Sequence, residues 1–311
     1  MNQDKATLAA KPQPPVSPAV MLTVAILAVS LAAIFIRKAD APPLFVAFGR
    51  CFVSTVVLLP FTLRPLLREL GSIPKRSRYF ALLAGVLLGA HFAAWISSLS
   101  LSSVSSCVVL ANTTPIWAAV LTPLLAHEAI EARVRRGIFC SFLGVLVIEG
   151  PALFSGEGAW QGDMLALGAG LLAALYLLCG SRARVHFSIG SYLLVCYGAA
   201  TAVLFVAVLA TDTPLTGYSN ETLVWVVLLG LISQLIGHST FNWALRYLSA
   251  AVVSLSLLVE PILTALWAWL ILSEPPTWLV AIGGLIVLSG VWVATRPSGP
   301  SKVAQEAHGA S

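Results

Sequence analysis

The sequence predicts an all-α integral membrane protein in which ten transmembrane helices form two inverted five-helix repeats around a central cavity. Three observations lead to this prediction: the composition, the length of the apolar segments and a repeat at a fixed offset. Of the 311 residues, 58% are hydrophobic and 10% are charged, whereas roughly 25% of a soluble domain is charged. Barrel strands would give short segments of alternating hydrophobicity, which this sequence lacks, so the spans are predicted to be helices.

Ten apolar segments follow one another along the chain, and each approaches the roughly 20 residues that a helix needs to cross a bilayer. The first one resembles a signal peptide, because two lysines precede it and residues 39–41 look like a cleavage site. Arg37 and Lys38 stand directly before that site and argue against cleavage. We therefore interpret all ten segments as true spans, over residues 19–36, 43–63, 79–98, 103–126, 136–154, 163–180, 189–210, 222–244, 249–272 and 277–295.

The positive charges predict how the chain is oriented. With the N-terminus in the cytoplasm, the outer loops receive Arg37 and Lys38, Arg50 lies inside the second segment, and every other Lys and Arg faces the cytoplasm. The positive-inside rule therefore favours this orientation in the cytoplasmic membrane. Both termini are expected inside, as polar, disordered tails at residues 1–17 and 297–311. The net charge of +5 then reflects topology and not nucleic-acid binding.

A shift of 146 residues superposes one half of the chain on the other. It aligns prolines, glutamates and glycines in the same order, namely Pro115 with Pro261, Glu128 with Glu274, Gly137 with Gly283 and Gly144 with Gly290. The halves, residues 18–155 and 156–296, would each hold five spans, and this odd number places the second copy upside down. Inverted repeats are typical of secondary transporters, whose substrate site lies near the bilayer midplane between the halves.

Two stretches resemble a known family. The stretch ALRYLSAAVVSLSLLVEPILTALWAWLILSE, from Ala244 to Glu274, is similar to the second-repeat signature of EamA-type transporters in the drug/metabolite transporter superfamily. Its first-repeat counterpart is SSLSLSSVSSCVVLANTTPIW, from Ser97 to Trp117. The resemblance covers residues 19–295, and it implies ten helices around a central cavity, alternating access and export of amino acids or other metabolites. The Ser-rich stretch 97–106 departs from the pattern, and it either alters the cavity mouth or makes close packing.

Few ionisable residues lie within the predicted spans, where such groups usually face a bundle interior or a watery cavity. They are Arg50, His91, Glu149, His238 and Glu260. Gln234, His238 and Asn242 stand at i, i+4 and i+8 on the eighth span, and His91 and Trp95 at i and i+4 on the third, so each set forms a stripe. We expect both stripes to line one substrate cavity. The alternative is that these side chains bond neighbouring helices to each other.

Pro115 and Pro261 each free a carbonyl four residues earlier, which a membrane helix tolerates only where a side chain, a neighbour or water satisfies that group. We expect these prolines to form helix breaks or gates near the midplane, with Asn112 beside the first and Glu260 beside the second. In one hypothesis, Glu260 binds a substrate ammonium group or a proton. In the other, it bonds the freed backbone or Arg50.

Motif searches exclude several classes of protein. The five cysteines stand singly, so neither a disulfide framework nor a metal site is predicted. The sequence lacks the ATP-binding motif G-x-x-x-x-G-K-[ST], and it lacks H-E-x-x-H and G-x-S-x-G, which leaves an intramembrane enzyme as a remote alternative.

We therefore expect a non-enzymatic exporter of a small molecule in the lipid bilayer, without cofactor, metal or nucleic acid. The alternative is a proton-coupled permease for drugs or other metabolites. The sequence identifies neither the substrate nor the coupling ion, for which protons are the candidate, and we favour a monomer.

Overall fold

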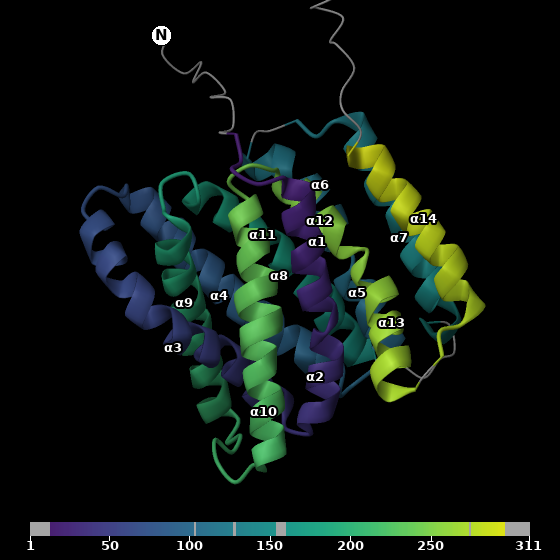
Figure 1. Ribbon diagram of the computed structural model, residues 1–311, viewed down its shortest axis with the longest axis horizontal. Coiled ribbons are helices and arrows are strands. Elements are labelled where there is room, and N and C mark those ends of the chain that lie inside the picture. The colour runs from purple at the N-terminus through teal and green to yellow at the C-terminus, as the bar shows by residue number, and fades with distance from the viewer. Residues whose placement is uncertain (1–12, 103, 127–128, 154–159, 274, 296–311) are drawn as a thin grey trace, which may run out of the picture.

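The computed structural model describes residues 13–102, 104–126, 129–153, 160–273 and 275–295 (Figure 1). Most of the two predicted tails lies outside the described residues. So do Glu128 and Glu274, which the sequence places near helix ends, where a carboxylate favours the N-terminus of the next helix. All regular structure in the described part of the chain is helical, as predicted.

Helix covers each of the ten apolar segments. Six of the segments form one helix each: α3 (Pro43–Glu69), α4 (Lys75–Ser98), α7 (Ala132–Leu153), α8 (Trp160–Ala183), α9 (Ile189–Ala210) and α14 (Trp278–Thr295). The other four are interrupted, and they comprise α1 (Pro18–Ser30) with α2 (Ala32–Ala39); α5 (Val104–Ala111) with α6 (Thr114–Leu121) and the π-helix η1 (Thr122–Ala126); α10 (Asn220–Leu228) with the π-helix η2 (Leu229–His238) and α11 (Ser239–Ala244); and α12 (Ala250–Leu257) with α13 (Glu260–Leu272).

Nine helical stretches among the described residues are long and apolar enough to cross a membrane. The helix over the fifth predicted segment, α7, is not among these nine. The chain is thus a multi-pass helical membrane protein, and a tenth span stays a prediction.

Proline and serine mark where many of the helices begin. Proline occupies one of the first two positions of α1, α3, α6 and α13, where its missing N–H removes no helical hydrogen bond. Ser188, Ser219 and Ser249 precede α9, α10 and α12, and each side chain accepts a hydrogen bond from a backbone N–H of the first turn. Such caps satisfy donors that would otherwise be left unpaired.

The bundle is arranged with α3, α4 and α9 at one edge and α7 and α14 at the other (Figure 1). Helix α4 packs against α8 and α9, α3 packs against α9, and α1 packs against η2. The largest buried apolar cluster joins α1, α3, α4, α8, α9, α11 and α12. Sequence-distant segments from both halves therefore surround the middle of the bundle.

Helices α7 and α14 cross at four glycines. A Cβ atom on Gly137 would lie 2.6 Å from the carbonyl oxygen of Gly290, and one on Gly144 would lie 2.6 Å from that of Gly283. Because the partner number falls as the α7 number rises, the two helices run antiparallel. Between these pairs, the Ser141 hydroxyl donates to the Val287 carbonyl at 3.0 Å. Small residues allow this close approach of two backbones, as is common between membrane helices.

The substitution Gly144→Ala is expected to destabilise the protein. Its new Cβ would also lie 2.7 Å from the Val287 nitrogen, so the two backbones must separate, at about 1–3 kcal/mol for an overpacked site. The matched control is Gly168→Ala in α8, where an added Cβ would meet nothing within 4 Å. Melting temperatures in detergent measure both effects. A Gly144→Ala protein that melts with the wild type would contradict the prediction.

Candidate functional site

A central cavity of about 230 Å³ lies between the two halves of the chain. Most of its wall is apolar. Its polar and ionisable lining residues are Arg50, His91, Asn112, Thr114, Tyr176, His238, Glu260 and Thr264. A second hollow, lined by residues of α1, η1, α7, α12 and α14 and the loops beside them, contains no residue that the sequence proposed for the site.

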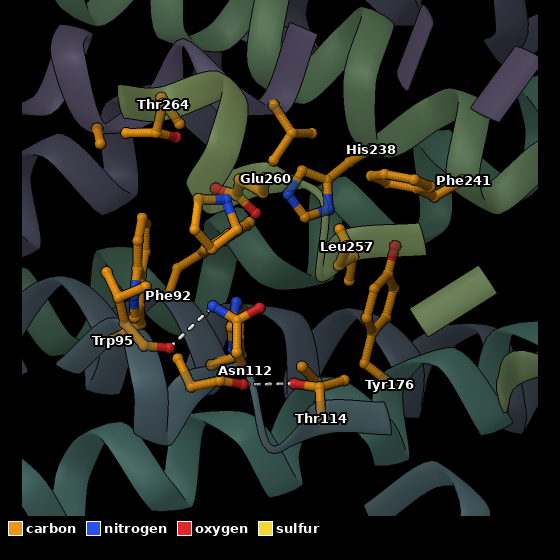
Figure 2. Close-up of a pocket in the computed structure, with 18 of the residues that line it drawn as sticks. Phe92, Trp95, Asn112, Thr114, Tyr176, His238, Phe241, Leu257, Glu260 and Thr264 are labelled. Carbon is orange, nitrogen blue, oxygen red and sulfur yellow. Dashed lines mark hydrogen bonds between the residues drawn. The ribbon is translucent and has the colours of Figure 1, made fainter. Parts of the chain in front are cut away.

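The structure brings most of the predicted site residues to the central cavity. Figure 2 shows Asn112 on one side of this cavity, with Glu260 and His238 on the opposite side. The lining contains six of the predicted residues, namely His91, Trp95, Asn112, His238, Glu260 and Pro261. Pro115, Gln234 and Asn242 are not part of the lining.

At the first helix break, a neighbouring hydroxyl bonds the carbonyl that the proline leaves free. Pro115 has no N–H for the carbonyl of Ala111, and the Thr114 hydroxyl donates to that carbonyl instead, at 2.8 Å. The same hydroxyl lies 3.1 Å from the Gly170 carbonyl on α8. The Asn112 side-chain amide donates to the Val108 carbonyl at 2.9 Å. The polar side chains before Pro115 thus bond the backbone carbonyls around the break between α5 and α6, and Thr114 also links this break to α8.

At the second helix break, the residue before the proline is a glutamate and not a threonine. Glu260 begins α13 directly before Pro261, and its carboxylate lines the cavity. Among the described residues, neither a hydrogen bond nor an ion pair to this carboxylate is found, so it bonds neither the freed backbone nor Arg50. The hypothesis in which Glu260 meets a substrate or a proton stays a prediction.

The two histidines face the cavity from opposite halves of the chain. His91 on α4 places its Nδ1 atom 2.9 Å from the carbonyl oxygen of Ala169 on α8, so Nδ1 carries the hydrogen and Nε2 is the acceptor in the neutral ring. The His91 ring lies parallel to that of Trp95, with 6.4 Å between centroids. His238 packs edge-on against Phe92, with 5.2 Å between centroids. His91 therefore both lines the cavity and bonds its own helix, α4, to α8.

The stripe predicted on the eighth span is only partly formed. Gln234 and Asn242 are fully buried beside the cavity, and only His238 of that set lines it. The prediction assumed an uninterrupted α-helix, whereas residues 229–238 form a π-helix. Gln234 and His238 lie in this π-helix and Asn242 follows it in α11, so the three positions do not belong to the single regular α-helix that the spacing assumed. The Asn242 side-chain amide instead donates to the His238 carbonyl at 2.8 Å.

Arg50 also lines the cavity, although the predicted site did not include it and the sequence suggested it only as a partner for Glu260. It is 1% exposed, and its Nε donates to the Gln234 side-chain oxygen at 3.1 Å. Its guanidinium carbon lies 3.8 Å from the centroid of the Phe92 ring, a cation–π contact. The signal was present in the sequence, since a charge inside a span is by default a functional-site hypothesis.

Residues that commonly bind metals are not clustered in the described part of the chain, where no group of three His, Cys, Asp or Glu could hold an ion. The site is therefore made of separate polar groups around a small apolar cavity. Such a wall suits a small organic molecule with a few polar groups.

The fold and the cavity define a class of protein: a helical membrane protein that encloses a mostly apolar cavity, with a few polar groups, between its two halves. Comparison with known families agrees with this class. The model of the EamA-like transporter family matches the chain twice, over residues 17–150 and 160–296. The chain belongs to this family of transporters.

Curated relatives extend along most of the chain. An uncharacterized transporter of Archaeoglobus fulgidus is 28% identical over 284 residues, which cover 88% of this chain and 95% of the relative. The pseudopaline exporter CntI of Pseudomonas aeruginosa is 23% identical, covering 81% and 85%. The human solute carrier family 35 member G1 is 23% identical, covering 86% and 76%.

A solved structure has the same fold. Its chain superposes with a TM-score of 0.74 at 18% sequence identity, over 89% of this chain and 96% of that chain. At this identity the likeness concerns the fold alone.

The substitution Gln234→Leu is expected to destabilise the protein, because it removes the acceptor from a buried guanidinium. Losing a partner of a buried charged group costs about 1–3 kcal/mol or more. The control is Thr55→Val on α3. It removes a hydrogen bond between two neutral hydroxyls, those of Thr55 and Thr201, which lie 3.1 Å apart. This loss should lower the free energy of unfolding by about 1 kcal/mol. Thermal unfolding in detergent compares the two. Equal losses of stability in the two variants would show that the hydrogen bond from Arg50 to Gln234 stabilises the protein no more than the bond between the two neutral hydroxyls.

Proposed function

We propose that the protein is a secondary transporter that exports small metabolites across the cytoplasmic membrane by alternating access, with amino acids as the first candidates. The observation that carries this proposal is the central cavity, whose wall is built from both copies matched by the family model. His91, Trp95 and Asn112 come from the first copy, and His238 and Glu260 from the second. A site between two copies is accessible to either side of a membrane when one copy rocks against the other.

We also propose that the two copies, residues 18–155 and 156–296, form an inverted repeat of ten helices. The antiparallel crossing of α7 and α14 supports this arrangement, because these helices occupy the same place in each copy. In the described ranges, three contacts join residues 146 positions apart: Thr55 with Thr201, Cys140 with Ile286, and Ser141 with Val287. Contacts between a residue and its own mate are expected on a two-fold axis that relates the copies.

The substrate class is inferred from the cavity. Its small volume and mostly apolar wall favour a small amphipathic molecule, and Glu260 can hold an ammonium group. One relative is named as an exporter, of pseudopaline, which supports the direction of transport proposed here. The alternative remains a proton-coupled permease for drugs or other metabolites, in which Glu260 carries the proton. Both termini are proposed to lie in the cytoplasm, following the distribution of Lys and Arg.

Transport by purified protein in liposomes tests the proposal. Liposomes are loaded with one radiolabelled amino acid at a time, and efflux is measured with and without a pH gradient, against liposomes without protein. Efflux of at least one amino acid above the empty liposomes is expected. Acceleration by a proton gradient would identify protons as the coupling ion. Absence of efflux across the whole panel would contradict amino-acid export.

The substitution Glu260→Gln is expected to abolish most of the transport or to remove its pH dependence, while leaving insertion and thermal stability unchanged. The amide keeps the shape of the side chain but carries neither the charge nor the titratable proton. The test measures the transport rate at two pH values and the melting curve of the variant and of the wild type. Unchanged transport at both pH values, with unchanged stability, would remove Glu260 from the mechanism.

The matched control is Glu221→Gln. Glu221 stands in the exposed first turn of α10, outside the cavity lining. It loses the same charge without touching the site, so its transport rates should equal those of the wild type.

A further inference from the structure

The cavity wall contains a buried cation whose hydrogen bonding is incomplete. The Nε atom of Arg50 is bonded to Gln234, and the face of the guanidinium packs on Phe92. Its Nη2 atom is buried and has no hydrogen-bond partner among the described residues. Within the same part of the chain, Arg50 takes part in no ion pair. A guanidinium in such surroundings is stabilised by an anion or by further acceptors.

Glu260 is not the anion that pairs with the Arg50 guanidinium. Glu260 lines the same cavity but is not within ion-pair distance of Arg50. The wall therefore presents a guanidinium and a carboxyl group at separate places. Between them it is largely apolar, with aromatic and aliphatic side chains that include Phe92, Trp95 and Leu257. A molecule that complements this wall has a carboxylate, an ammonium group and an apolar portion.

We propose that Arg50 binds the carboxylate of the substrate, and that this contact makes the protein selective for amphipathic amino acids. The inference rests on the transport function proposed above. The planar guanidinium offers donors in a fixed fork that matches a carboxylate. Gln234 occupies Nε and Phe92 holds the plane, so both position the guanidinium, and Nη2 is the donor that still lacks a partner. Glu260 then receives the ammonium group.

Paired probes test the carboxylate contact in the wild-type protein. The probes are L-leucine and L-phenylalanine, each compared with its own amide, which keeps the ammonium group and side chain but lacks the carboxylate. Half-saturating concentrations are measured in proteoliposomes. We expect the amide to need a concentration about 10- to 100-fold higher than the acid, as for loss of a charged hydrogen bond. Equal values for acid and amide would overturn the proposal.

The substitution Arg50→Lys tests the residue itself, since it keeps a positive charge but removes the fork. We expect the half-saturating concentration of the acid to rise about 10-fold or more, and that of the amide to stay unchanged. Loss of affinity shared equally by acid and amide would mean that Arg50 supports the fold and does not contact the substrate, which overturns the proposal. If this variant does not fold, the comparison of acid and amide in the wild type decides.

A matched control is available in the same protein. Arg184 is likewise buried, at 2% exposure, and its Nε donates to the Asn242 carbonyl at 3.2 Å, but it is not part of the cavity lining. The substitution Arg184→Lys should therefore leave both half-saturating concentrations unchanged, whatever it does to the melting temperature. If it shifts the acid and the amide as Arg50→Lys does, the Arg50 effect is not one of contact and the proposal fails.

Failure of this inference and failure of the proposed function give different results. If acids and amides are transported with equal affinity, the transport function stands and the role of Arg50 is wrong. If neither acid is transported but the amides are, the protein is a permease for amines, which also overturns the carboxylate contact. If none of the probes moves, the proposal of amino-acid export fails, and the inference fails with it.

Discussion

A backbone carbonyl inside a bilayer has no water to bond, and this constraint decides where the helices of this protein can break. The break between α5 and α6 is possible because the Thr114 hydroxyl reaches the carbonyl that Pro115 leaves free. The same hydroxyl bonds α8, so one side chain both repairs the backbone and fixes the broken helix in the bundle. Asn112 is thereby held at the cavity wall, and the shape of the site follows from the repair.

The burial of Arg50 imposes a second, related requirement on the helices around it. Its acceptor Gln234 lies on the π-helix η2, which approaches α3 closely, as the hydrogen bond from Ser54 to the Gly230 carbonyl at 2.7 Å shows. An added Cβ on Gly230 would lie 3.1 Å from the Arg50 carbonyl oxygen. Glycine therefore lets the two backbones meet where the guanidinium needs its acceptor. The ten-residue π-helix η2 carries Gln234, the residue that orients the guanidinium.

The helical class and the position of all ten apolar segments could be predicted, because hydrophobicity and length are local properties of the chain. His91 and Glu260 could be predicted as cavity residues because ionisable groups inside a span usually avoid the lipid. Gln234 could not be placed correctly, because a π-helix depends on how neighbouring helices pack and leaves no clear mark in the sequence. The role of Arg50 also needed three dimensions, since Phe92 and Gln234 approach it only in the folded bundle.

The two proline breaks carry unlike side chains at equivalent places, and this difference explains how a repeated sequence makes an asymmetric site. Under the shift of 146 residues, Thr114 corresponds to Glu260. A hydroxyl can donate to a freed carbonyl, but an ionised carboxylate is an acceptor only, so Glu260 in its ionised form cannot perform the repair that Thr114 performs. The first copy therefore uses this position to hold its backbone, whereas the second presents a carboxylate to the cavity. With Arg50 in the wall from the first copy, the copies contribute a guanidinium and a carboxyl group, and in the proposal made above a bound zwitterion would join the two.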